Sequence, residues 1–176
     1  MIRRIAVSVF ALISALVVVV APAASAAPAA CAVDWGSLEK RNPPTTRGNL
    51  VDIRSGQQDC YDRLVFDFRG ENDGYIVRYV DEVHEDPTGR PVPLRGGAKL
   101  LVIAESPAYD DNGNPTYTYP NRDELVDVTG YATFRQVAWA GSFEGQTSVG
   151  LGVRARLPFR VFTLPGRLVV DVAHSW

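Results

Sequence analysis

The chain has 176 residues, of which 46% are hydrophobic and 22% are charged. This composition is ordinary for one globular domain with a tail, and it argues against disorder along the whole length. The formal net charge of −2 lacks the basic excess of a nucleic-acid-binding protein, so we expect no nucleic-acid partner. Two cysteines and two histidines are too few for a metal cluster or for a disulfide-dense small fold.

The segment 1–26 has the pattern of a secretory signal peptide. Arg3 and Arg4 form a short basic start, residues 5–21 are apolar, and the small residues at 24–26 fit a signal peptidase site. A transmembrane anchor is the alternative, because an apolar stretch of this length lies near the lower limit for spanning a bilayer. The small residues favour cleavage. We therefore expect a secreted, extracellular protein, which meets the membrane only through the uncleaved signal peptide.

Residues 27–48 are predicted to form an N-terminal arm that is tethered to the domain. Export places Cys31 and Cys60 in an oxidising compartment, where two thiols usually form one disulfide. The loop that this bond closes has about 30 residues, which on the chain-entropy account contributes about 3.5 kcal/mol. A reactive thiol pair would need a C-x-x-C spacing, which this pair lacks. Trp35 also suggests that the arm packs on the domain.

From residue 49 onward the chain reads as short strands separated by turn residues. In the segment Asp62–Arg69, three apolar residues, Leu64, Phe66 and Phe68, alternate with other side chains. Similar patterns predict further strands at 75–80, 99–106, 147–153, 159–163 and 167–172. Short strands at intervals of roughly 8–12 residues indicate an all-β domain, either a β-sandwich or a barrel of mostly antiparallel strands.

Two local features complete this outline of the domain. The residues Asp111–Asn114 predict a hairpin turn between 103–109 and 116–119. The segment 121–126 is the one place where a short helix is expected, because no other segment has a helical period.

Catalytic and metal-binding patterns are missing from the sequence. His84 and His174 lie too far apart for H-E-x-x-H or H-x-x-x-H, and each is better explained as a salt-bridge partner. Residues 110–114 resemble the start of a calcium loop, but Pro115 and Asn121 stand where an EF-hand has glycine and glutamate. We therefore expect no metal, no cofactor and no catalytic residue.

Candidate binding residues are aromatic or charged. Tyrosine and tryptophan rings can stack on sugars, and arginines can bind carboxylates. The alternative is cross-strand packing for the rings and solvated strand faces for the arginines. The predicted binding residues are Tyr117, Tyr119, Trp139, Arg154, Arg156 and Glu144, and Arg160 has the same potential. Glu144 with Asp67 or Asp171 could also form the carboxylate pair of a glycan hydrolase, the least favoured interpretation.

Two predicted strands share one charge pattern. Arg63-Leu-Val-Phe-Asp67 and Arg167-Leu-Val-Val-Asp171 each place an arginine and an aspartate four residues apart, hence on one strand face. The arginine of each strand is expected to pair with the aspartate of the other. This pairing is interpreted as structural.

These strands also carry a family resemblance. Together with several other segments they resemble the AMIN-like domain proteins of the actinobacterial cell envelope. The matching segments are Trp35–Lys40, Cys60–Phe66, Gly74–Val80, Gly141–Thr147, Gly152–Phe162 and Arg167–His174. The resemblance implies a single β-sandwich over residues 49–176, because AMIN domains are β-sandwiches that attach envelope enzymes and secretion machinery to peptidoglycan.

The favoured hypothesis is therefore a secreted, non-enzymatic binding module for peptidoglycan or another wall polymer. The alternative is an envelope adaptor that binds a protein partner through a strand edge or an apolar patch. A small carboxylate-dependent glycan hydrolase is the third possibility.

Overall fold

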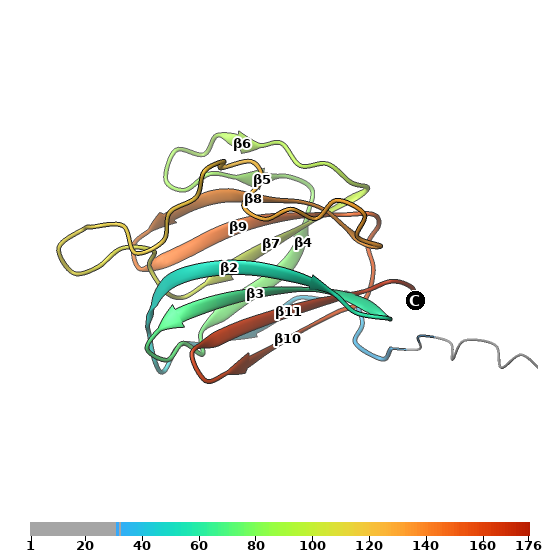
Figure 1. Cartoon of the computed structure of the whole chain (residues 1–176), viewed down its shortest axis with the longest axis horizontal. Helices are drawn as coiled ribbons and strands as arrows, with labels where there is room; N and C mark the ends of the chain where they lie inside the picture. Colours follow the sequence, from blue (N-terminus) through green and yellow to red (C-terminus); the bar gives the residue numbers. More distant parts are fainter. Residues whose placement is uncertain (1–30, 32) are drawn as a thin grey trace, which may run out of the picture.

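The computed structural model of the protein describes residue 31 and residues 33–176. The predicted signal peptide, residues 1–26, lies outside this part. The described chain forms two antiparallel sheets packed as a β-sandwich (Figure 1), which confirms the predicted all-β fold. One sheet has the order β1 (Lys40–Asn42), β4 (Tyr75–Val80), β7 (Ala98–Ala104), β9 (Gln146–Val153) and β8 (Phe134–Phe143). The other has the order β10 (Phe159–Leu164), β11 (Arg167–Ala173), β3 (Tyr61–Arg69) and β2 (Asn49–Gln57).

The apolar residues of the predicted strands form the core between the sheets. In β3 the side chains of Leu64, Phe66 and Phe68 belong to this core, and in β11 those of Leu168 and Val170 do the same. Their neighbours in the chain face the opposite side, because successive side chains of a strand alternate. The four-stranded sheet therefore presents an outer face built from the alternate residues of β3 and β11.

The long connection between β7 and β8 closes the sandwich at the β2 and β8 edges. Its Thr116 hydroxyl donates to the carbonyl of Leu50 in β2 at 2.7 Å, while the Leu125 amide donates to the carbonyl of Val137 in β8 at 2.8 Å. The predicted helix at 121–126 is wrong, because this segment consists of turns whose polar groups bond to the edge strand β8. The predicted hairpin at Asp111–Asn114 is reduced to one bridge, between Tyr109 and Pro115.

A small hairpin covers part of the outer face of the five-stranded sheet. Its strands are β5 (Val83–His84) and β6 (Pro91–Val92), and it lies at the top of Figure 1. Val83 and Val92 form a second apolar cluster with Ala138 and Ala140 of β8. The chain after β6 passes so close to β9 that a Cβ atom on Gly152 would lie 2.0 Å from the Arg95 carbonyl oxygen. The glycines that interrupt β9 therefore allow this second layer to pack.

The N-terminal arm is tied to the domain as predicted. Cys31 and Cys60 form a disulfide. The Trp35 ring packs edge-on against Tyr61 at 5.6 Å between centroids, and β1 continues the five-stranded sheet by pairing with β4. The described part of the arm thus contacts both sheets.

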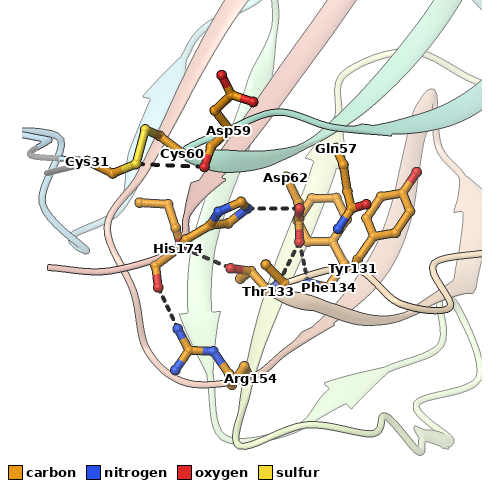
Figure 2. Close-up of polar contacts among 12 residues, drawn as sticks. Cys31, Gln57, Asp59, Cys60, Asp62, Tyr131, Thr133, Phe134, Arg154 and His174 are labelled. Carbon is orange, nitrogen blue, oxygen red and sulfur yellow. Dashed lines mark hydrogen bonds and ion pairs between the residues drawn. A yellow bond between two sulfur atoms is a disulfide. The ribbon is translucent and has the colours of Figure 1, made fainter. Parts of the chain in front are cut away.

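A buried carboxylate joins β3, β8 and the C-terminal residues. The Asp62 side chain is fully buried and accepts hydrogen bonds from the amides of Thr133, at 2.6 Å, and Phe134, at 2.9 Å (Figure 2). Its other oxygen lies 3.0 Å from Nε2 of His174. Hydrogen bonds to a buried carboxylate offset its desolvation, so these contacts hold the end of the sandwich together.

The disulfide predicts a measurable loss of stability on reduction. A Cys31→Ser/Cys60→Ser variant is expected to lose about 3.5 kcal/mol of unfolding free energy, because the unfolded chain gains loop entropy. For a chain of this size that loss lowers Tm by roughly 10 °C. Thermal unfolding with and without reductant measures the effect. Reductant should leave the double variant unchanged, and an equal Tm for oxidised and reduced wild type would contradict the tether.

Candidate functional site: the Arg–Asp face

The outer face of the four-stranded sheet carries an aspartate held by two arginines. Asp171 in β11 lies opposite Arg63 in β3, and this pair is bidentate, with Arg63 Nε and Nη2 at 2.7 and 2.9 Å from the two carboxylate oxygens. Arg160 in β10 donates to the same carboxylate through Nε at 2.8 Å. The Asp171 side chain is fully buried, whereas those of Arg63 and Arg160 are 28% and 39% exposed.

A second aspartate is held in the same way further along the same strands. Asp67 in β3 lies opposite Arg167 in β11, and Arg167 Nε lies 3.2 Å from its carboxylate. Arg54 in β2 reaches the same carboxylate with Nε at 2.6 Å and Nη2 at 3.1 Å. The expected cross-strand pairs, Arg63 with Asp171 and Arg167 with Asp67, are therefore confirmed. We call this surface the Arg–Asp face, made of Arg54, Arg63, Asp67, Arg160, Arg167 and Asp171.

Three aromatic rings border one end of the Arg–Asp face. The Arg160 guanidinium carbon lies 4.4 Å from the centre of the Trp35 ring, 5.2 Å from Tyr61 and 5.3 Å from Phe162. Arg63 lies 5.2 and 5.5 Å from the rings of Tyr61 and Phe162. Arginine attracts the faces of aromatic rings, so these contacts orient the guanidinium groups around Asp171.

The carboxylates also set the charge of this surface. The hydrogen bonds that Arg63 donates to Asp171 raise the pKa of Arg63, and those that Arg54 donates to Asp67 raise the pKa of Arg54. These arginines stay protonated at any physiological pH. The four arginines outnumber the two aspartates that they share, and the nearby Asp52 of β2 adds one further negative charge beside Arg54. The face can therefore offer directed N–H donors and a local positive charge to a ligand.

The structure brings the three predicted aromatic residues together at the closed edge of the sandwich. The ring centroids of Tyr117, Tyr119 and Trp139 lie 5.1–5.8 Å apart. Tyr117 is 8% exposed and belongs to the core, and burial raises its pKa to about 12. Tyr119 and Trp139 pack on the core while keeping part of their surface exposed.

The predicted arginines Arg154 and Arg156 both hold other segments of the chain in place. Arg154 donates to the His174 carbonyl oxygen at 2.5 Å (Figure 2). Arg156 contacts Ser37 of the arm and, with Tyr79 and Lys99, lines a hollow of about 310 Å³. Neither residue belongs to the Arg–Asp face.

The predicted Glu144 occupies the exposed turn between β8 and β9 with a φ of 50°. It lines a hollow of about 150 Å³ with Asp86, Phe143 and Gln146. Its two suggested carboxylate partners, Asp67 and Asp171, are instead engaged by arginines.

The histidines have carboxylate neighbours. His84 lies 3.0 Å from Glu82, and His174 contacts Asp62.

Across residues 31 and 33–176, no group of three or more metal-ligating side chains comes together. In the same part of the chain, no helix is long and apolar enough to cross a membrane.

The sequence predicts two arginine–aspartate pairs of the Arg–Asp face and offers Arg160 as a candidate. No sequence pattern points to Arg54, or to Tyr61 and Phe162 as rings that border the face. The repeated Arg-Leu-Val-x-Asp pattern is the sequence signal for the two arginine–aspartate pairs. When two antiparallel strands with this pattern pair in register, they place charged residues at both ends of one outer face.

The fold and the face define a small all-β domain whose charged surface is one side of a sheet. The model of the AMIN-like domain family matches residues 48–174. The chain therefore belongs to the AMIN-like domain family, as the resemblance implied. No curated protein and no solved structure matches the chain.

Glu85 lies next to the aromatic cluster, which consists of Tyr117, Tyr119 and Trp139. Its carboxylate is expected to make the stability of the fold depend on pH. Hydrogen bonds from Arg122, Thr88 and Arg90 lower the pKa of Glu85 from 4.5 to about 2. This carboxylate therefore stabilises the fold above pH 4.5, and its contribution is lost as the pH falls from there toward 2.

A Glu85→Gln variant is expected to show a lower urea midpoint than wild type at pH 6 and a gap that closes toward pH 2. Urea unfolding between pH 2 and 7 measures this difference. Glu144→Gln, a change in an exposed turn, is the matched control. A Glu85→Gln deficit that stayed constant with pH would contradict the assignment.

Proposed function

We propose that this protein is a secreted, non-enzymatic module of the cell envelope that binds peptidoglycan or another wall polymer through the Arg–Asp face. Membership of the AMIN-like family supports a role at the cell wall. The disulfide agrees with an extracellular location, because such bonds persist outside the cytosol. The observation that carries the proposal is the pair of arginine-held aspartates beside three aromatic rings on one sheet face.

This arrangement suits a polymer of sugars with charged substituents. Aromatic rings such as Trp35 and Tyr61 can stack on the apolar faces of sugars, and guanidinium groups can bind carboxylates or phosphates in a bidentate way. The arginines are already held by Asp67 and Asp171, so binding costs them less side-chain entropy. The proposed interaction needs no cofactor.

Catalysis by carboxylates is the less favoured function. Glu144 and Asp86 line one hollow, but its volume of about 150 Å³ is small for a ligand pocket, which typically has roughly 300–1,000 Å³. The proposal therefore gives Glu144 no catalytic role.

Co-sedimentation with purified peptidoglycan sacculi tests the proposal. Wild type is expected to pellet saturably, and Arg160→Gln/Arg167→Gln to bind at least ten-fold more weakly, because each aspartate then keeps only one arginine. The matched control is Arg41→Gln/Arg78→Gln, which removes two arginines from Glu39 near the β1–β4 edge of the other sheet. The control should pellet like wild type, and equal Tm values would show that all three proteins are folded.

Two outcomes would redirect the proposal. Loss of pelleting in a folded Tyr117→Leu/Tyr119→Leu variant, with the arginine variant unaffected, would place the wall contact at the aromatic cluster. No pelleting of wild type would favour the alternative function, an adaptor for an envelope protein.

A further inference from the structure

We propose that the Arg–Asp face recognises a polyanion, with one carboxylate or phosphate group of the same polymer chain bound at each of its two aspartate-centred units. This inference rests on the proposed function and names the ligand class of that site. The two units are the unit around Asp171, with Arg63 and Arg160, and the unit around Asp67, with Arg54 and Arg167.

Each unit keeps hydrogen-bond donors that its aspartate does not use. A guanidinium group has five N–H donors, and none of its nitrogens accepts. Asp171 takes Nε and Nη2 of Arg63 but only Nε of Arg160, whose side chain remains 39% exposed. Two arginines on one carboxylate also leave one net positive charge. The Asp171 unit is thus a preformed receptor for one further anion.

The Asp67 unit repeats this arrangement in a more open setting. Arg167 contacts Asp67 through Nε, and the side chains of Arg54 and Arg167 are both 50% exposed. Asp67 itself is 22% exposed, in contrast to the fully buried Asp171. This unit therefore meets solvent more freely, and its contact with an anion is expected to depend more strongly on salt.

The register of β3 and β11 fixes the spacing between the units. Arg167 lies opposite Asp67 and Asp171 lies opposite Arg63, so the two units are four residues apart along the paired strands. At about 3.3 Å per residue this separation is about 13 Å. Val65 and Val169 pair between them and are only 5% and 1% exposed. A polymer chain lying along the strands would reach both units.

The aromatic rings distinguish the two ends of the face. Trp35, Tyr61 and Phe162 surround the arginines of the Asp171 unit. The Asp67 unit has no cation–π contact among residues 31 and 33–176. A sugar beside the anion would therefore stack at the Asp171 end, which gives the bound polymer a preferred direction.

Binding at two linked units has a quantitative consequence. Once one anion is bound, the second unit meets the next anion of the same chain at an effective concentration near the millimolar range. A polyanion is therefore expected to bind about 100-fold more tightly, per anionic group, than the matching single anion.

Titrations of the purified protein with defined anions test this inference. The probes are acetate against poly-L-glutamate, inorganic phosphate against long-chain polyphosphate, and dextran as the neutral polymer, each followed through the NMR signals of the arginine Nε–H groups. We expect the roughly 100-fold advantage for both polyanions and no shift with dextran.

The variant Arg54→Gln/Arg167→Gln removes one unit and leaves the other intact. It should retain inorganic phosphate binding at Arg63 and Arg160 but lose the polymer advantage, while Arg41→Gln/Arg78→Gln keeps that advantage. The inference is overturned if single anions bind as tightly as polyanions, if dextran binds equally well, or if the variant keeps the full advantage.

Sacculi separate this inference from the proposed function. Saturable pelleting that polyanions do not displace would leave wall binding in place and overturn the polyanion inference. Bivalent polyanion binding without pelleting would leave the polyanion inference in place and overturn the proposed wall binding. Sacculi stripped of phosphodiester-linked polymers by hydrofluoric acid identify the source of the anion: retained pelleting indicates carboxylates of the peptidoglycan itself, and lost pelleting indicates phosphate polymers.

Discussion

The in-register pairing of β3 with β11 is the contact on which the rest of the molecule depends. It joins Arg63 and Asp171, which are 108 residues apart in the chain. A slip of one residue would turn every side chain of a strand to the other face, which would expose Leu64 and bury Arg63. The core on one side and the charge pairs on the other therefore specify the same register. Packing of the sandwich and geometry of the face are two results of one alignment.

The sequence predicts much of this strand alignment. The period-2 pattern of β3 and β11 predicted both strands, and their shared Arg-Leu-Val-x-Asp pattern predicted the cross-strand pairs. The two cysteines predicted the tether of the arm, because the chain offers each only one partner. These features were predictable because each depends on a short, regular pattern or on a single possible pairing.

Other features were not predictable, and the reasons are physical. The strand β8 was missed because bulges between Phe134 and Gln136 and between Trp139 and Gly141 break its alternation, and because the β5–β6 hairpin buries its outer side. The aromatic border of the Arg–Asp face joins three distant segments, the arm, β3 and β10. The disulfide, the strand order and the hydrogen bond from the Phe159 amide to the Gly36 carbonyl oxygen bring these segments together, and none of the three follows from a local period.

The described chain begins and ends at the same end of the sandwich (Figure 1). Cys31 is bonded to Cys60, directly before β3, and β11 finishes beside it, where Ala173 pairs with Tyr61. Tension applied between Cys31 and the C-terminus would therefore peel β11 from β3 one residue pair at a time, because their cross-strand hydrogen bonds would be loaded in sequence. The contacts of His174 with Asp62 and with the Cys60 carbonyl lie at this first pair. These contacts therefore strengthen the residue pair that would be the first to bear the force.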